Sequence, residues 1–327
     1  MGQLIKLEDY VSRYEQNIYH YPSRFVRLKK QQWENLKENL GNEQKETPDQ
    51  GFWYEDEKTP IINRLKGLFQ KRNQEVETKP VHGYTLAPEE KKDEEEMPFQ
   101  FTAQFSGRSM NEEEMKIQFL DQLFRFQLKW ATSTIAEKSH MNSQYFYDEK
   151  LKFFVQRFPD NFLVLYHPIF LLKSAPTESE IILISPTDTW CITFLEAEEN
   201  AVFQGSNEHF WIKRIQHQEK KVLNPLIALN RTGTIIQKIY QLNEIELPIH
   251  KIVLSRNGYI DFPHAPSDVR FYEKRNFEEW FQAMRRLKSP LKHIQLKSAG
   301  ALLQYCQTTS YRRPEWDLLD DEQKGES

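Results

Sequence analysis

The chain has 327 residues, of which 39% are hydrophobic and 28% charged, so it can bury a substantial core. No apolar stretch approaches the roughly 20 residues that a membrane-spanning helix needs, and two cysteines, Cys191 and Cys306, are too few for a disulfide framework or a cysteine-rich zinc site. The first residues lack a signal-peptide core. We therefore expect a cytoplasmic protein with no membrane partner.

The net charge of −4 hides an uneven distribution. Residues 201–300 hold 16 basic against 9 acidic side chains. Such a segment can form a basic face for the phosphate backbone of DNA, and the candidate contacts are Lys213, Arg214 and Arg231. The basic residues come mostly singly and in pairs, however, which also suits ordinary solvated faces, and we favour that interpretation.

Residues 1–75 are predicted to form a helical N-terminal region. Aromatic residues recur at three- and four-residue spacing between positions 10 and 21, and a second helix is expected at 23–41. Residues 76–109 include a run of eight charged residues at 89–96, too polar to be buried. We expect an exposed acidic linker there, and the aromatic helices together with this linker could also serve a protein partner.

Residues 110–290 are predicted to form an α/β domain, and 291–327 a C-terminal helix and tail. The domain begins with an amphipathic helix at 110–135, where Asn111 is a suitable cap and three glutamates follow it. Its central pair of strands is expected at 181–184 and 191–195, around the turn Ser-Pro-Thr-Asp. Further strands are expected at 162–172, 201–204, 210–214 and 247–255, and helices after Asn224, at 276–287 and at 299–306.

Acidic residues flank the central pair of strands. Glu178 and Glu180 precede its first strand and Glu196 follows its second. Antiparallel pairing sets the start of one strand beside the end of the other, so the three carboxylates could converge at one edge of the sheet. Carboxylate oxygens are the ligands that Mg²⁺ prefers, so the sequence predicts a weak site for Mg²⁺ or Mn²⁺.

This arrangement resembles the nuclease-related domain (NERD) family, a branch of the PD-(D/E)xK restriction-endonuclease-like nucleases. In that family an Asp on one strand and a Glu-x-Lys on the next surround the metal. Glu180 stands in place of the Asp, whereas Thr193 and Leu195 stand where Glu and Lys belong. The Asn-Pro-Leu segment at 224–226 is similar to one that opens the family's next helix. In the family, the helix before the first strand also bears an acidic residue, which Glu113 or Glu114 could match.

The resemblance implies a restriction-endonuclease-like mixed sheet flanked by helices, and a nuclease-like protein that has lost or nearly lost catalysis. Thr193 removes a metal ligand and Leu195 removes the cation, and each loss should lower the rate by orders of magnitude. A nucleic-acid-binding or scaffold module would remain. The alternatives are an active DNA nuclease that uses Lys213 as a relocated lysine, or a purely protein-interacting module. His167 is a further candidate base, although a hydrogen-bonded histidine at a strand end is commoner.

Overall fold

The computed structural model describes residues 1–43, 101, 103, 111–172, 175–216 and 218–313. Two compact units divide the chain, one made of residues 1–34 with 101–327 and the other of residues 35–100. The expected linker at 76–109 lies almost wholly outside the described residues. Everything below concerns the first unit.

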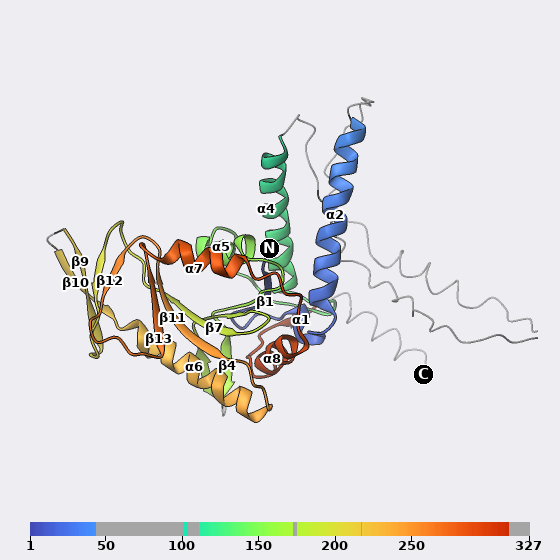
Figure 1. Ribbon diagram of the computed structural model, residues 1–327. Coiled ribbons are helices and arrows are strands. Elements are labelled where there is room, and N and C mark those ends of the chain that lie inside the picture. Colours follow the sequence, from blue (N-terminus) through green and yellow to red (C-terminus); the bar gives the residue numbers. More distant parts are fainter. Residues whose placement is uncertain (44–100, 102, 104–110, 173–174, 217, 314–327) are drawn as a thin grey trace, which may run out of the picture. The chain divides into compact units, whose positions relative to one another are not determined.

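A six-stranded mixed sheet is the centre of this unit (Figure 1). Its order is β1-β3-β6-β7-β11-β13, and β6 runs against the other five strands. The predicted central pair is confirmed, because β6 and β7 occupy the middle of the sheet. The strands are β1 (Gln3–Leu7), β3 (Leu163–Tyr166), β6 (Ile181–Ile184), β7 (Thr189–Phe194), β11 (Ile249–Ser255) and β13 (Val269–Glu273).

Because five strands run in one direction, the two ends of the sheet differ. We call the end where those strands finish the carboxyl edge; it lies beyond Leu7, Tyr166, Phe194 and Ser255. The end where they start is the amino edge, and it lies before Gln3, Leu163, Thr189 and Ile249. The antiparallel β6 begins at the carboxyl edge and ends at the amino edge.

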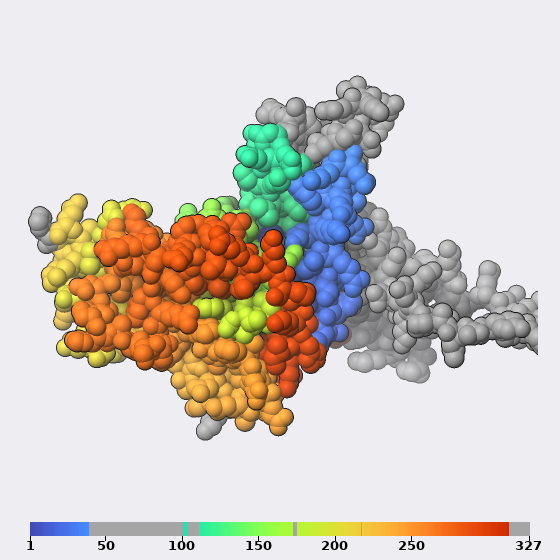
Figure 2. Space-filling view, in the orientation of Figure 1, coloured from blue at the N-terminus to red at the C-terminus, as the bar shows by residue number. Residues whose placement is uncertain are grey.

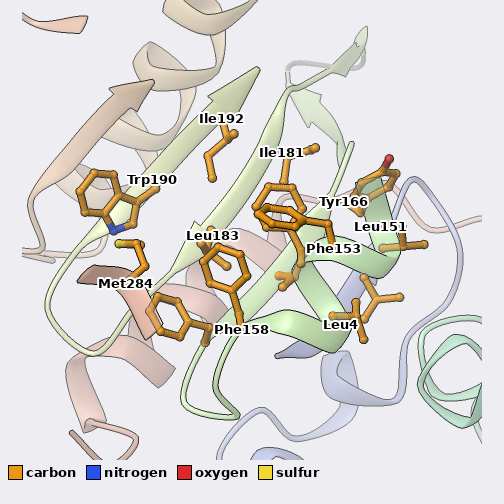
Figure 3. Close-up of a cluster of buried hydrophobic side chains, with 14 of the residues drawn as sticks. Leu4, Leu151, Phe153, Phe158, Tyr166, Ile181, Leu183, Trp190, Ile192 and Met284 are labelled. Carbon is orange, nitrogen blue, oxygen red and sulfur yellow. The ribbon is translucent and has the colours of Figure 1, made fainter. Parts of the chain in front are cut away.

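Helices cover both faces of the sheet, so the expected α/β class, a mixed sheet flanked by helices, is confirmed. The helix α6 (Pro225–Leu242) packs on β7 and β11 from one face, while α5 (Glu149–Arg157) and α7 (Phe277–Arg285) cover the other (Figure 1). Side chains alternate along each strand. Ile181, Leu183, Trp190 and Ile192 thereby enter one apolar cluster with residues of α5 and α7 (Figure 3).

The first residues differ from the helical region that was expected over residues 1–75. Residues 3–7 form the strand β1, in which every side chain is buried and which pairs in parallel with β3. A helical region does follow, as expected, with α1 (Arg13–Gln16) and α2 (Tyr21–Glu43). The aromatic spacing reflects packing, since Tyr14 and Tyr21 meet the ring of Trp130 edge-on at 6.0 and 5.6 Å between centroids.

Trp130 ends the long helix α4 (Glu112–Trp130), which confirms the amphipathic helix expected there. Asn111 accepts a hydrogen bond from the Glu114 backbone N–H at 2.8 Å, and the Glu114 side chain accepts one from the Asn111 N–H at 3.3 Å. This reciprocal cap satisfies two backbone donors at the helix start. Glu114 therefore has a structural role at the helix terminus.

A smaller, four-stranded sheet has the order β10-β9-β8-β12. Its strands are β8 (Val202–Gln204), β9 (Phe210–Ile215), β10 (Gln218–Leu223) and β12 (Tyr259–Asp261). The other elements are short pairs, a 3₁₀ turn and a last helix. They are β2 (Glu137–Lys138) with β14 (Tyr311–Arg312), β4 (Ile169–Leu172) with β5 (Ala175–Glu178), η2 (Ser143–Phe146) and α8 (His293–Gln304).

The region expected to be a separate C-terminal helix and tail contributes to the same unit as the sheet. Gln295 of α8 is fully buried and donates to the carbonyl oxygens of Asn161 and Ile184, at 2.6 and 3.0 Å. β1 likewise ties the first residues to the sheet. Among the described residues, no helix is long and apolar enough to cross a membrane.

Candidate functional site

The two glutamates predicted to share a cation lie on opposite faces of the sheet. Pairing of Ile181 with Ile192 places Glu180 beside Thr193 on the face covered by α6, where the Glu180 backbone N–H donates to Thr232 Oγ1 at 2.9 Å. Glu196 lies three positions beyond Thr193. It forms an ion pair with Arg256, whose guanidinium stands 5.1 Å from the ring centroids of Phe153 and Phe194 on the other face.

The third predicted ligand does not restore the cation site. Glu178 ends the strand β5, is exposed, and pairs with Ile169 of β4. Within the described ranges no cluster of three or more His, Cys, Asp or Glu side chains could hold a metal ion. Thr193 and Leu195, at the two signature positions, are 6% and 8% exposed, so packing accounts for them.

The predicted basic contacts are also separated. Lys213 and Arg214 are neighbours on β9, so their side chains point to opposite faces of the strand. Lys213 binds Glu198 and Arg214 binds Glu219, both at 2.8 Å. Arg231 is exposed on α6, in a different element. A relocated catalytic lysine at position 213 would therefore have to leave an existing ion pair.

His167 lies at the carboxyl edge, where its side chain contacts a backbone carbonyl group. The residue has a left-handed φ of 47°, and its Nδ1 is 3.2 Å from the carbonyl oxygen of Ser179. The neighbouring Tyr166 donates to Asp148 at 2.8 Å, and burial, followed by the charge of Asp148, raises the pKa of the Tyr166 hydroxyl. These contacts hold the chain between β3 and β5.

The amino edge contains a histidine–carboxylate pair that sequence analysis did not single out. His250 Nε2 lies 2.8 Å from Asp188 Oδ1, and this is the one contact between a histidine and a carboxylate in the described part of the chain. The two residues come together because β7 pairs in parallel with β11, which sets Trp190 opposite His250. Both side chains are 25% exposed, so solvent and small ligands can reach them.

A tight turn fixes the aspartate. Ser185 Oγ accepts the backbone N–H of Asp188 at 2.9 Å, and the Ser185 N–H donates to the Asp188 carbonyl at 2.8 Å. The second carboxylate oxygen, Oδ2, accepts the hydroxyl of Thr187 at 2.5 Å. Serine, threonine and aspartate favour such turns because their side chains bond the nearby backbone. Asp188 is therefore held in place before any ligand binds.

The same contacts select the tautomer of the histidine. An ionised carboxylate only accepts hydrogen bonds, so the Nε2 facing Asp188 carries the proton and Nδ1 presents a lone pair when the ring is neutral. The Trp190 ring lies 4.4 Å from the imidazole between centroids, tilted by 34°, and restricts the rotation of the imidazole. The geometry is that of a general base oriented by a carboxylate.

The sequence carried only faint signals for this pair. Asp188 lies in a predicted turn, and His250 lies in a predicted buried strand in which it is one of few polar residues. The two positions are 62 residues apart. The two residues meet only through the pairing of β7 with β11, and a crossover helix separates these strands along the chain.

Comparison with known proteins corrects the predicted relationship. Over 132 residues the chain is 35% identical to an RNA 2',3'-cyclic phosphodiesterase of Geobacillus stearothermophilus, a match that covers 39% of this chain and 36% of the relative. The chain thus matches little more than a third of that protein's length. No family model matches the chain, and no solved structure matches it.

The relative's name denotes a different enzyme family from the nuclease-related domain. The predicted membership of that family, and the inactive DNA-nuclease or scaffold function built on it, are therefore wrong, and an active DNA nuclease fits no better. The physical reason for the error is the split of Glu180 and Glu196 between two faces. A similar order of elements does not imply the same chemistry.

Proposed function

We propose that this protein hydrolyses 2',3'-cyclic phosphate ends of RNA, with His250 as the general base and Asp188 as the residue that positions it. The observation that carries the proposal is the 2.8 Å contact between His250 Nε2 and Asp188 Oδ1. The partial relative supplies the substrate class, because its name is that of an RNA 2',3'-cyclic phosphodiesterase.

The reaction adds water across one P–O bond of the cyclic ester. The water oxygen bonds to phosphorus and the bond from phosphorus to one ribose oxygen breaks, which leaves a phosphate monoester. His250 Nδ1 takes the proton of the attacking water, and solvent protonates the released ribose oxygen. Asp188 stabilises the imidazolium that forms and keeps the proton on Nε2. The imidazolium then loses its extra proton to solvent.

The substrate must be RNA in this proposal, because only RNA has the 2' oxygen that closes such a ring. A carboxyl edge filled with internal ion pairs also favours placing the reaction at the amino edge. There the exposed face of the imidazole offers Nδ1 without a partner among the described residues.

The test is an assay on a short RNA ending in a 2',3'-cyclic phosphate, with the monoester product measured by its new sensitivity to a phosphatase. Wild type should open the ring. His250→Gln should lower kcat by about 100- to 10,000-fold, as expected for loss of a general base. Asp188→Asn should also lower kcat, because an amide can donate to the ring and stabilise the wrong tautomer.

His264→Gln is the matched control, since His264 is an exposed histidine outside the six-stranded sheet; its kcat should equal that of wild type. Thermal melting of each variant checks that the fold is intact. Absence of ring opening by wild type, or full activity in a folded His250→Gln variant, would contradict the proposal.

A further inference from the structure

A second feature of the amino edge is a cavity of about 580 Å³. One wall comes from α2, with Ser23, Val26 and Arg27, and the other from the segment 285–291 that follows α7. These two parts of the chain, blue and orange-red, adjoin at the surface in Figure 2. Cavities of about 300–1,000 Å³ are typical of small-ligand sites, so the volume suits a mononucleotide.

The cavity presents an excess of positive charge. Arg27, Arg285 and Lys288 line it, all three are exposed, and none of them forms an ion pair with a described carboxylate. Asp160 is the one acidic residue in the lining, and Lys29 already pairs with it. Guanidinium groups match the geometry of phosphate oxygens, and a lysine adds a further point charge.

Asn161, also in the lining, holds the segment that follows α7 in place. Asn161 is 7% exposed, and its Nδ2 donates to the carbonyl oxygens of Leu287 and Ser289 at 2.8 and 2.7 Å. These bonds fix which end of the amide is the oxygen. Oδ1 is buried and has no partner in the described part of the molecule. The two bonds donated by Nδ2 fix the position of the wall that carries Leu287 and Lys288.

The cavity lies at the same edge of the sheet as the histidine–carboxylate pair. Asn161 precedes β3 at the amino edge, and Arg285 follows Met284, which lies beside Trp190 in the apolar cluster (Figure 3). The ring of Trp190 in turn contacts His250. The end of α7 thus connects the cavity lining to Trp190 and His250.

We infer that this cavity binds a nucleotide through its phosphate, with Arg27, Arg285 and Lys288 as the cationic contacts. Apolar surface for the nucleobase comes from Val26, Leu287 and Leu291. That the nucleotide belongs to an RNA end rests on the proposed function; nucleotide binding itself does not.

Isothermal titration calorimetry with adenosine 3'-monophosphate, inorganic phosphate and adenosine tests the inference on the full chain. The nucleotide should bind, and each of the other two should bind at least about 10-fold more weakly, since each supplies only part of the contacts. Arg27→Gln and Arg285→Gln should each weaken nucleotide binding by about 10-fold or more, the usual effect of losing a charge-assisted hydrogen bond. Arg270→Gln, an exposed arginine on β13, should bind as wild type does.

Equal affinity for nucleotide and inorganic phosphate would overturn the nucleotide assignment. Absence of nucleotide binding, or unchanged binding in both folded arginine variants, would overturn the site. Because binding is measured without turnover, failure of this inference and failure of the catalytic proposal give different results.

Discussion

The two edges of the central sheet contain similar residue types, but they differ in how far the charged side chains neutralise one another. At the carboxyl edge the charged groups neutralise one another: Lys6 binds Glu15, Arg256 binds Glu196, and the hydroxyls of Tyr145 and Tyr166 bind Glu8 and Asp148. At the amino edge Asp188 orients His250, and Arg27, Arg285 and Lys288 of the cavity form no ion pair with a described carboxylate.

This difference shows why residue type alone is a weak guide to a functional site. Ligands of open α/β sheets commonly bind beyond the carboxyl ends of the strands, and the glutamates there suggested metal chemistry. Glu196 is already paired with Arg256, and Glu180 lies on the other face of the sheet. A site is marked by polar groups that the fold holds in place but does not neutralise.

The largest effect on stability should come from Lys6, at the carboxyl edge. Its side chain is fully buried and its Nζ donates to the Tyr10 carbonyl at 2.8 Å and to Thr308 at 2.9 Å, besides pairing with Glu15. Lys6→Met keeps an apolar stem but leaves Glu15 without its cation. Removing one partner of a buried pair should lower the free energy of unfolding by about 3–5 kcal/mol, measured by denaturant titration.

The matched change at the amino edge is Asp188→Ala. Because both members of the Asp188–His250 pair are a quarter exposed, its loss should cost only about 1 kcal/mol or less, although it should lower kcat for ring opening. A larger loss of stability from Asp188→Ala than from Lys6→Met would contradict the contrast between the two edges.

An intermediate effect is expected for Arg256. The Arg256 side chain is 26% exposed and that of Glu196 is 13% exposed, and the guanidinium also covers Phe153 and Phe194. Arg256→Ala should lower the free energy of unfolding by about 2–3 kcal/mol. Its kcat for cyclic phosphate ends should stay within about twofold of wild type at a temperature where it is folded. A selective loss of kcat would place chemistry at the carboxyl edge.

The central hairpin was predictable because its signals are local. Ile181–Ile184 is a continuous apolar run, and the turn after it has turn-forming residues. The cap before α4 predicted that helix, and Asn224 followed by proline predicted α6. In each of these elements, neighbours in sequence determine the conformation.

What could not be predicted depends on pairing between distant segments. The five residues of β1 show no period and become a strand only through β3. The faces of Glu180 and Glu196 depend on the register of β6 with β7, and a shift of one residue would reverse either face. The meeting of Asp188 with His250 likewise depends on a crossover connection.

A further effect, confined to high pH, concerns the sheet between the two edges. Cys191 is fully buried there, and burial raises the pKa of its thiol to about 12 from an ordinary value of 9.0. The unfolded thiol loses its proton first as pH rises, so this contribution to stability is present below about pH 9 and is lost between pH 9 and 12. Stability measured against pH should fall less steeply for Cys191→Ala than for wild type. Native protein should resist thiol reagents at pH 8; rapid labelling of Cys191 there would show that the sheet opens.

The pairing of β1 with β3 has a consequence for synthesis in the cell. The first strand leaves the ribosome long before its partner, because Gln3 pairs with Leu163. At about 5–20 residues per second, the gap lasts roughly 10 to 30 s. During that interval an apolar segment with unpaired backbone groups is open to association with other chains. We therefore expect newly made chains, unlike the finished protein, to depend on chaperones that shield extended apolar segments.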